Sequence, residues 1–123
     1  MNVVKKLHTV RNSRQFRQVY EQGQKFHTSL FSVFIQKTQG NERRVGITVT
    51  RKVGNAVIRN RCKRRIREAL RILFGESVSM PGFDLVVNAK SSLIEAEFGQ
   101  IVEALAKVIG RFQESQLKVE RPS

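Results

Sequence analysis

The sequence is poor in the side chains from which protein active sites are usually built. Its 123 residues include one cysteine, Cys62, and two histidines, His8 and His27. A single cysteine excludes an intrachain disulfide and a thiolate-rich zinc site, and we expect Cys62 to be a buried apolar residue. Neither histidine has a Cys, Asp or Glu at metal-ligand spacing. We therefore expect the protein alone to bind no metal.

Acidic residues are scarce in the first part of the chain. Residues 1–71 hold 18 Lys and Arg but only Glu21, Glu42 and Glu68 as acids. General acid–base catalysis needs a positioned pair of titratable groups, and these three form no convincing pair. Asp84 begins an expected strand and is interpreted as a structural cap or loop ligand. The sequence thus predicts no catalytic residue.

Long apolar runs, repeats and low-complexity segments are also missing. The N-terminal segment has no apolar run of signal-peptide length and nothing approaches the length of a membrane span, so a cytoplasmic location is the default expectation. Eight phenylalanines and a hydrophobic content of 40% suffice for one core. We expect a single domain over residues 1–115 and a flexible tail over residues 116–123.

Positive charge is what the chain has in abundance. The formal net charge is +13 and the sequence pI is about 11.1. Residues 72–123 hold only five Lys and Arg against seven Asp and Glu, so the excess lies entirely in residues 1–71. This distribution predicts that the N-terminal half meets a polyanionic partner.

The first half of the chain has the pattern of one helix followed by two or three strands. Asn12 or Ser13 can cap a helix that Gly23 ends. Residues 26–36 are rich in aromatic and β-branched side chains and residues 44–50 alternate, as strands do. We expect these two strands to pair antiparallel across the polar turn between them.

The second half predicts helix, strand and helix. Residues 55–74 form the longest expected helix, closed by Gly75, and residues 83–89 form a strand buried on both faces. A capping box at 92–95 precedes a final helix with an apolar stripe. Strand–helix–strand favours parallel pairing across the long helix. The expected class is α/β (α+β), a two-layer sandwich of a mixed sheet and helices.

Residues 51–71 carry nine basic side chains, seven of them Arg, and one acid, Glu68. At helical spacing the apolar face consists of Cys62, Ile66, Ala69 and Leu73. The opposite face consists of Asn60, Lys63, Arg64, Arg67 and Arg71, with Arg61 beside it. Arg59 and Arg65 lie nearer the apolar edge, around which they can reach.

Two plainer interpretations of this helix are a solvated surface and a membrane-binding face. Solvated faces usually mix charges of both signs, whereas only Glu68 balances this one. A membrane-binding face is disfavoured because the apolar side lacks Trp and holds Cys62 and Ala69. Arginine forks suit phosphate, and Gly54 before the helix can let backbone approach it. We therefore expect phosphate binding.

Residues 52–68, Lys-Val-Gly-Asn-Ala-Val-Ile-Arg-Asn-Arg-Cys-Lys-Arg-Arg-Ile-Arg-Glu, resemble the signature of the ribonuclease P protein family. The similarity extends to Phe16, Val19 and Gly23, to Arg44-Val45-Gly46 and to the Asp84-Leu-Val-Val run. It covers most of residues 11–90. The last helix is similar only in pattern, and residues after Gln113 add nothing.

The resemblance implies an unusual left-handed crossover in the strand–helix–strand unit, which no residue pattern here indicates. It also implies an auxiliary subunit of a ribonucleoprotein endonuclease. The catalytic RNA hydrolyses precursor tRNA at the 5′ end of the mature tRNA with RNA-held Mg²⁺. The protein, one monomer per RNA, binds that RNA and the single-stranded 5′ leader, and broadens substrate specificity.

The site residues follow from the same resemblance. Those expected to contact the catalytic RNA are Lys52, Arg59, Asn60, Arg61, Lys63, Arg64 and Arg67. Those expected to line the leader cleft, between the first helix and the sheet, are Phe16, Tyr20, Phe34 and, as a weaker member, Phe31. Alternation places Phe31 on the other strand face from Phe34. The alternative for all four aromatics is ordinary core packing.

Three other functions share some of these features. A ribosomal or other structural RNA-binding protein would have the same size, charge and basic helix, and only the ordered signature argues against it. A protein-only nuclease requires metal ligands that the sequence lacks. A DNA-binding regulator predicts dimerisation heptads or a helix-turn-helix, and neither is evident.

Overall fold

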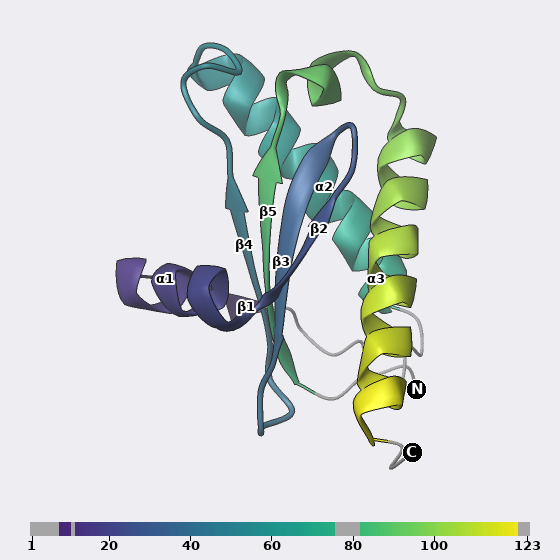
Figure 1. The fold of residues 1–123 in the computed structure, drawn as a ribbon. Coiled ribbons are helices and arrows are strands. Elements are labelled where there is room, and N and C mark those ends of the chain that lie inside the picture. The colour runs from purple at the N-terminus through teal and green to yellow at the C-terminus, as the bar shows by residue number, and fades with distance from the viewer. Residues whose placement is uncertain (1–7, 11, 76–81, 121–123) are drawn as a thin grey trace.

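The fold is a five-stranded mixed sheet with helices against both faces (Figure 1). The computed structural model describes residues 8–10, 12–75 and 82–120 of the chain. The strands lie in the order β1-β4-β5-β3-β2. Their bounds are β1 His8–Thr9, β2 Gln24–His27, β3 Phe31–Lys37, β4 Arg43–Thr48 and β5 Phe83–Ala89. The mixed α+β architecture expected from the sequence is confirmed.

The main core lies between the sheet and two helices, α2 (Ala56–Gly75) and α3 (Phe98–Glu120). Leu85 and Val87 of β5 point into this core, whereas Val86 between them packs on the other face with Val19 of α1 (Ser13–Gln22). Strand β5 is therefore buried on both faces, as its apolar run predicts. In Figure 1, α1 crosses the sheet opposite α2 and α3.

Three helix ends predicted from the sequence are confirmed: the start and the end of α1 and the start of α2. The Asn12 side chain caps α1 by accepting a hydrogen bond from the Gln15 backbone N–H at 2.9 Å. The Asn55 side chain accepts from the Ile58 N–H at 3.0 Å at the start of α2. Gly23 is the C-cap of α1, where a Cβ would lie 2.5 Å from the Val19 carbonyl oxygen.

The predicted strand over 26–36 is wrong in its extent. It is two antiparallel strands, β2 and β3, joined by residues 28–30. The Thr28 hydroxyl accepts from the Leu30 and Phe31 backbone N–H groups. A side chain that bonds nearby backbone in this way favours a turn over a continuous strand.

The predicted antiparallel pairing of the strands now identified as β3 and β4 is also wrong, because β5 lies between them. Strand β5 pairs antiparallel with β3 and parallel with β4. The expected parallel pairing across the long helix is thus confirmed. The hand of this crossover stays a prediction. The short β1, which pairs parallel with β4, was not predicted.

The capping box expected before the last helix does not begin that helix. Residues Ser91–Glu95 form a separate 3-10 turn, η1, and α3 starts at Phe98. Helix α3 continues through residues 116–120, and residues 121–123 of the expected tail lie outside the described part. None of the helices in the described ranges combines the length and apolar character that crossing a bilayer would require.

Candidate nucleic-acid interface

Helix α2 divides into a buried apolar face and an exposed cationic face. Cys62, Ile66 and Ala69 are buried against the core, as predicted, while Leu73 is only partly buried. Leu70 and Phe74 complete the buried face. The exposed members of the predicted cationic face are Asn60, Arg61, Arg64, Arg67 and Arg71, and Lys63 is half-buried.

The cationic face is poorly neutralised by the protein itself. Glu68 is the only acid in α2, and it pairs with Arg71 at 3.3 Å. Within the described part of the chain, the side chains of Arg61, Arg64 and Arg67 make no hydrogen bond or ion pair. Lys63, Arg64, Arg67, Asn60 and Val57 line a hollow of about 460 Å³ on this face. These side chains are available to an anionic ligand.

Two arginines at the edge of this face are placed differently. Arg65 is half-buried and donates from Nη1 to the Leu93 carbonyl at 3.1 Å and from Nη2 to the Ala96 carbonyl. Its role is therefore to hold the η1–α3 connection against α2. Arg59 is half-buried, and its Nε is enclosed without a hydrogen-bond partner in the described residues. Both arginines thus lie at the apolar edge, as predicted.

The residues before α2 are exposed at Lys52 but packed at Gly54. A Cβ on Gly54 would lie 3.0 Å from the Ile58 side chain. Glycine avoids this close contact with the helix, and that is a packing reason for Gly54 beside the predicted backbone approach to phosphate. Lys52 stands beside the N-terminal end of the cationic face.

A second feature, the groove beside α1, lies on the sheet face opposite α2. It has a volume of about 610 Å³ and is lined by Asn12, Ser13, Phe16, Arg17, Tyr20, Glu21 and Thr48. Helix α1 lies close to the sheet here because β4 has glycine at position 46. Phe16 and Tyr20 thus line one groove between α1 and the sheet, and the binding of a leader there stays a prediction.

The groove continues into an aromatic cluster on the sheet. The Tyr20 ring packs edge-on against Phe34 of β3 with centroids 4.8 Å apart, and Phe16 lies 6.3 Å from Tyr20. Tyr20 donates from its hydroxyl to Asn88 Oδ1 at 2.9 Å, and Lys25 Nζ lies 5.3 Å from the centre of the Phe34 ring. Such flat rings can stack with the bases of a single-stranded nucleic acid, and the neighbouring cation can neutralise its phosphates.

Phe31 does not belong to this cluster, and its inclusion among the groove residues is wrong. Its side chain is fully buried in the main core beneath α2 and α3. Phe34 points to the opposite face of the same strand. Asn88 and Lys25, in contrast, were not predicted, because finding them requires the order of the strands: Lys25 is opposite Phe34, and Asn88 is opposite Ser32.

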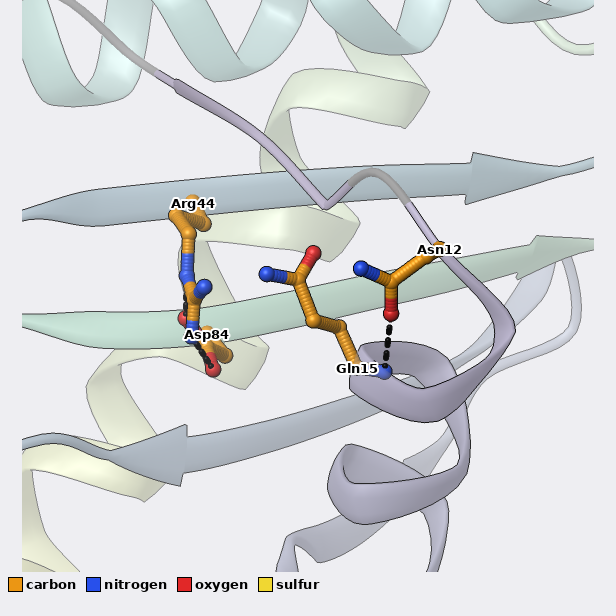
Figure 2. A network of polar contacts seen from close by, with 4 residues as sticks. All are labelled: Asn12, Gln15, Arg44 and Asp84. Atoms are coloured by element: carbon orange, nitrogen blue, oxygen red, sulfur yellow. Dashed lines mark hydrogen bonds and ion pairs between the residues drawn. The ribbon is translucent and has the colours of Figure 1, made fainter.

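Asp84 has a structural partner rather than a catalytic one. Its carboxylate accepts two hydrogen bonds from Arg44, at 2.7 Å from Nε and 2.6 Å from Nη2 (Figure 2). The two residues are opposite each other on the parallel strands β4 and β5. This pairing raises the pKa of the Arg44 guanidinium above its ordinary value. In Figure 2, the Gln15 side chain extends from α1 toward this part of the sheet.

The described residues contain no group of three or more His, Cys, Asp or Glu side chains that could hold a metal ion. Cys62 is buried, and burial raises the pKa of its thiol, although Arg65 and Arg61 oppose that rise. A thiol with a raised pKa is a weak nucleophile. The charged face of α2 and the aromatic cluster beside α1 are the surfaces of the described residues that are suited to binding a ligand.

Two curated relatives are similar to this chain over most of its length and of their own. One from Clostridium botulinum strain Langeland is 36% identical over 100 residues, which are 81% of this chain and 89% of the relative. One from Clostridioides difficile strain 630 is 35% identical over 102 residues, 83% and 89% of the two chains. Each is described as a ribonuclease P protein component.

Solved structures show the same fold. The Thermotoga maritima ribonuclease P protein matches with a TM-score of 0.74 and 30% identity, over 85% of this chain and 96% of that one. The Staphylococcus aureus ribonuclease P protein matches with a TM-score of 0.73 and 27% identity, over 85% and 94%. The family model described as Ribonuclease P matches residues 4–113. The chain therefore belongs to the ribonuclease P protein family.

Proposed function

We propose that this protein binds the catalytic RNA of ribonuclease P and the 5′ leader of precursor tRNA, and assists endonucleolytic removal of that leader. Membership of the family supports the role of a ribonuclease P subunit. The observation that carries the RNA-binding part is the unneutralised cationic face of α2. Its apolar side is packed in the core, so the helix can present its arginines on a fixed backbone.

The catalytic RNA is assigned to this face. The side chains of Arg61, Arg64 and Arg67 are exposed and have no polar partner among the described residues. Asn60 and Lys63 line a hollow together with Arg64 and Arg67. Lys52 extends the charge before the helix, and Arg59 lies at its edge. Guanidinium groups bind phosphate oxygens in a bidentate manner, which makes the contacts strong and directional.

The leader is assigned to the groove beside α1. Phe16 and Tyr20 line it, and Phe34 extends the aromatic surface past Tyr20. Bases of a single strand can stack on such rings regardless of sequence. Arg17 in the groove and Lys25 above Phe34 supply charge for the phosphates. A sequence-tolerant groove is consistent with a subunit that broadens substrate specificity.

Hydrolysis is assigned to the RNA subunit rather than to the protein. Mg²⁺ held by that RNA and the substrate would supply the charge stabilisation for phosphodiester hydrolysis. The carboxylates of the described residues form no cluster for such an ion, and Asp84 is engaged by Arg44. We propose one protein monomer per RNA, acting in the cytoplasm.

The test is cleavage of precursor tRNA at low Mg²⁺ concentration. Three reactions are compared: the protein alone, a bacterial ribonuclease P RNA alone, and both together. Efficient 5′-end cleavage only by the mixture supports the proposal. Cleavage by the protein alone would contradict it, and an absence of binding and assistance would leave a structural RNA-binding protein.

Two matched double variants separate the effect of the α2 face on cleavage from the effect of the protein's net charge. Arg64→Ala with Arg67→Ala should abolish most of the assistance, because it removes two exposed charges from the proposed interface. Lys107→Ala with Arg111→Ala removes the same amount of charge from exposed positions of α3. This second variant should still assist cleavage as the wild type does. Equal effects of the two pairs would show that only net charge matters.

A further inference from the structure

An exposed aromatic ring lies beside the cationic face of α2 and is not part of it. Phe98, the first residue of α3, is 36% exposed. Its ring lines a hollow of about 540 Å³ together with Arg61, Arg64, Arg65 and Glu68, all from α2. A single exposed phenylalanine needs no explanation on its own. Phe98, however, shares its hollow with three arginines, and such a combination is suited to binding a ligand.

The structure fixes Phe98 in this position. Arg65 bonds to the carbonyl groups of Leu93 and Ala96, both of which are buried residues just before α3. The start of α3 is therefore tied to the middle of α2. Because one arginine is used in this way, Arg61 and Arg64 are left as the free cations beside the ring, within the described part of the chain.

The chemistry of this hollow matches a nucleotide. An aromatic face stacks with a nucleobase, and guanidinium groups bind its phosphates. The one carboxylate in the lining, Glu68, is already paired with Arg71 at 3.3 Å. The base must be unpaired, since the faces of paired bases inside an RNA helix are covered by their neighbours.

We propose that the hollow between α2 and α3 binds one unpaired nucleotide of the RNA partner, with its base stacked on Phe98 and its phosphates contacted by Arg61 and Arg64. This inference rests on the proposed binding of ribonuclease P RNA to α2. It adds a base-stacking contact to a surface that otherwise makes phosphate contacts. It also explains why an aromatic ring stays exposed beside arginines.

The absence of tryptophan from the chain permits a direct test. Phe98→Trp introduces the only indole, whose fluorescence should be quenched when a bacterial ribonuclease P RNA is added. Leu117→Trp places an indole at an exposed position near the other end of α3 and should show no quenching. Equal signals from the two variants would overturn the proposal.

Affinity measurements separate stacking from charge. Phe98→Leu should weaken binding of the RNA roughly tenfold with an unchanged salt dependence, since no phosphate contact is lost. Phe98→Tyr should retain wild-type affinity. Circular dichroism and thermal unfolding check that each variant is folded.

The outcomes distinguish this inference from the proposed function. Wild-type affinity of Phe98→Leu, with weakened binding by Arg64→Ala, would overturn the nucleotide site and leave RNA binding by α2 intact. An absence of RNA binding by the wild-type protein would overturn both.

Discussion

The Phe16 ring lies against the backbone of Gly46, so that a Cβ at position 46 would be only 2.8 Å from Phe16 Cε1 and Cζ. Gly46→Ala should therefore displace α1 and destabilise the protein by about 1–3 kcal/mol. Urea unfolding measures this loss. Combining Gly46→Ala with Phe16→Leu should recover part of it, because the shared contact couples the two sites. Gly110→Ala, with open space around the new methyl group, is the control and should be neutral or stabilising.

The Arg44–Asp84 pair should be sensitive to the loss of either member. The Asp84 side chain is 4% exposed and that of Arg44 is 25% exposed. Asp84→Asn leaves a half-buried guanidinium without its counter-ion, and we expect a destabilisation of about 3 kcal/mol by urea unfolding. Glu103→Gln, which breaks the exposed pair with Lys107, should change stability by less than about 1 kcal/mol. Similar values for the two variants would refute the structural role of Asp84.

The buried thiol of Cys62 predicts a loss of stability at alkaline pH. Its folded pKa is raised by burial above the ordinary value, so the unfolded chain releases this proton first as the pH rises. Stability is then fully present below the ordinary thiol pKa of about 8.5 and declines above it, by up to about 1.4 kcal/mol per pH unit. Urea unfolding at several pH values should show this decline for the wild type relative to Cys62→Ala. Parallel curves would mean that the thiol does not titrate differently on folding.

Tyr20 should contribute to recognition of the leader. Tyr20→Leu removes the ring that lies between Phe16 and Phe34 in the aromatic cluster. The holoenzyme should lose about 1–3 kcal/mol of affinity for precursor tRNA with a leader and little for the same tRNA without one. Leu117→Ala, at an exposed apolar site of α3, serves as the control. An equal loss for both substrates would instead indicate a structural effect of Tyr20.

The cationic face of α2 should determine the salt dependence of RNA binding. Replacing Arg64 and Arg67 with Ala should weaken binding and flatten the plot of log affinity against log salt concentration by roughly one unit per lost phosphate contact. Filter binding at several salt concentrations measures both quantities. An unchanged affinity and slope would show that this face remains in solvent.

Local elements could be predicted from the sequence because their signals are local. The Asn12 cap, the Asn55 start of α2 and the apolar stripe of that helix each depend on residues within a few positions of one another. The cationic face of α2 follows from the same periodicity. None of these features depends on the order of the strands in the sheet.

The neighbours of each strand could not be predicted in this way. Strands 31–37 and 43–48 are adjacent in sequence, yet β5 separates them, because an apolar strand covered on both faces is more stable at the centre of a sheet than at an edge. Alternation places Phe31 and Phe34 on opposite faces of their strand, but it cannot show that the face of Phe31 lies in the main core beneath α2 and α3. Both faces of β3 are covered by helices, so each side carries an aromatic residue.

Lys25 and Asn88, which contact the aromatic cluster, were not predicted for the same reason. Each reaches the aromatic cluster only through its place in the sheet, opposite a residue of β3. Their own sequence surroundings carry no sign of a ligand. Phe98 is comparable, because its place beside α2 comes from the packing of α3 against α2 in the core and from the hydrogen bonds of Arg65 to the η1–α3 connection.

The central place of β5 has a consequence for synthesis of the protein. Among the described strands it is the last to leave the ribosome, and within that part of the chain it alone joins the β1–β4 pair to the β2–β3 pair. A nascent chain that ends before Phe83 thus has its whole basic helix but no continuous sheet on which to pack that helix. The chain can therefore present an ordered RNA-binding surface only when its synthesis is nearly complete.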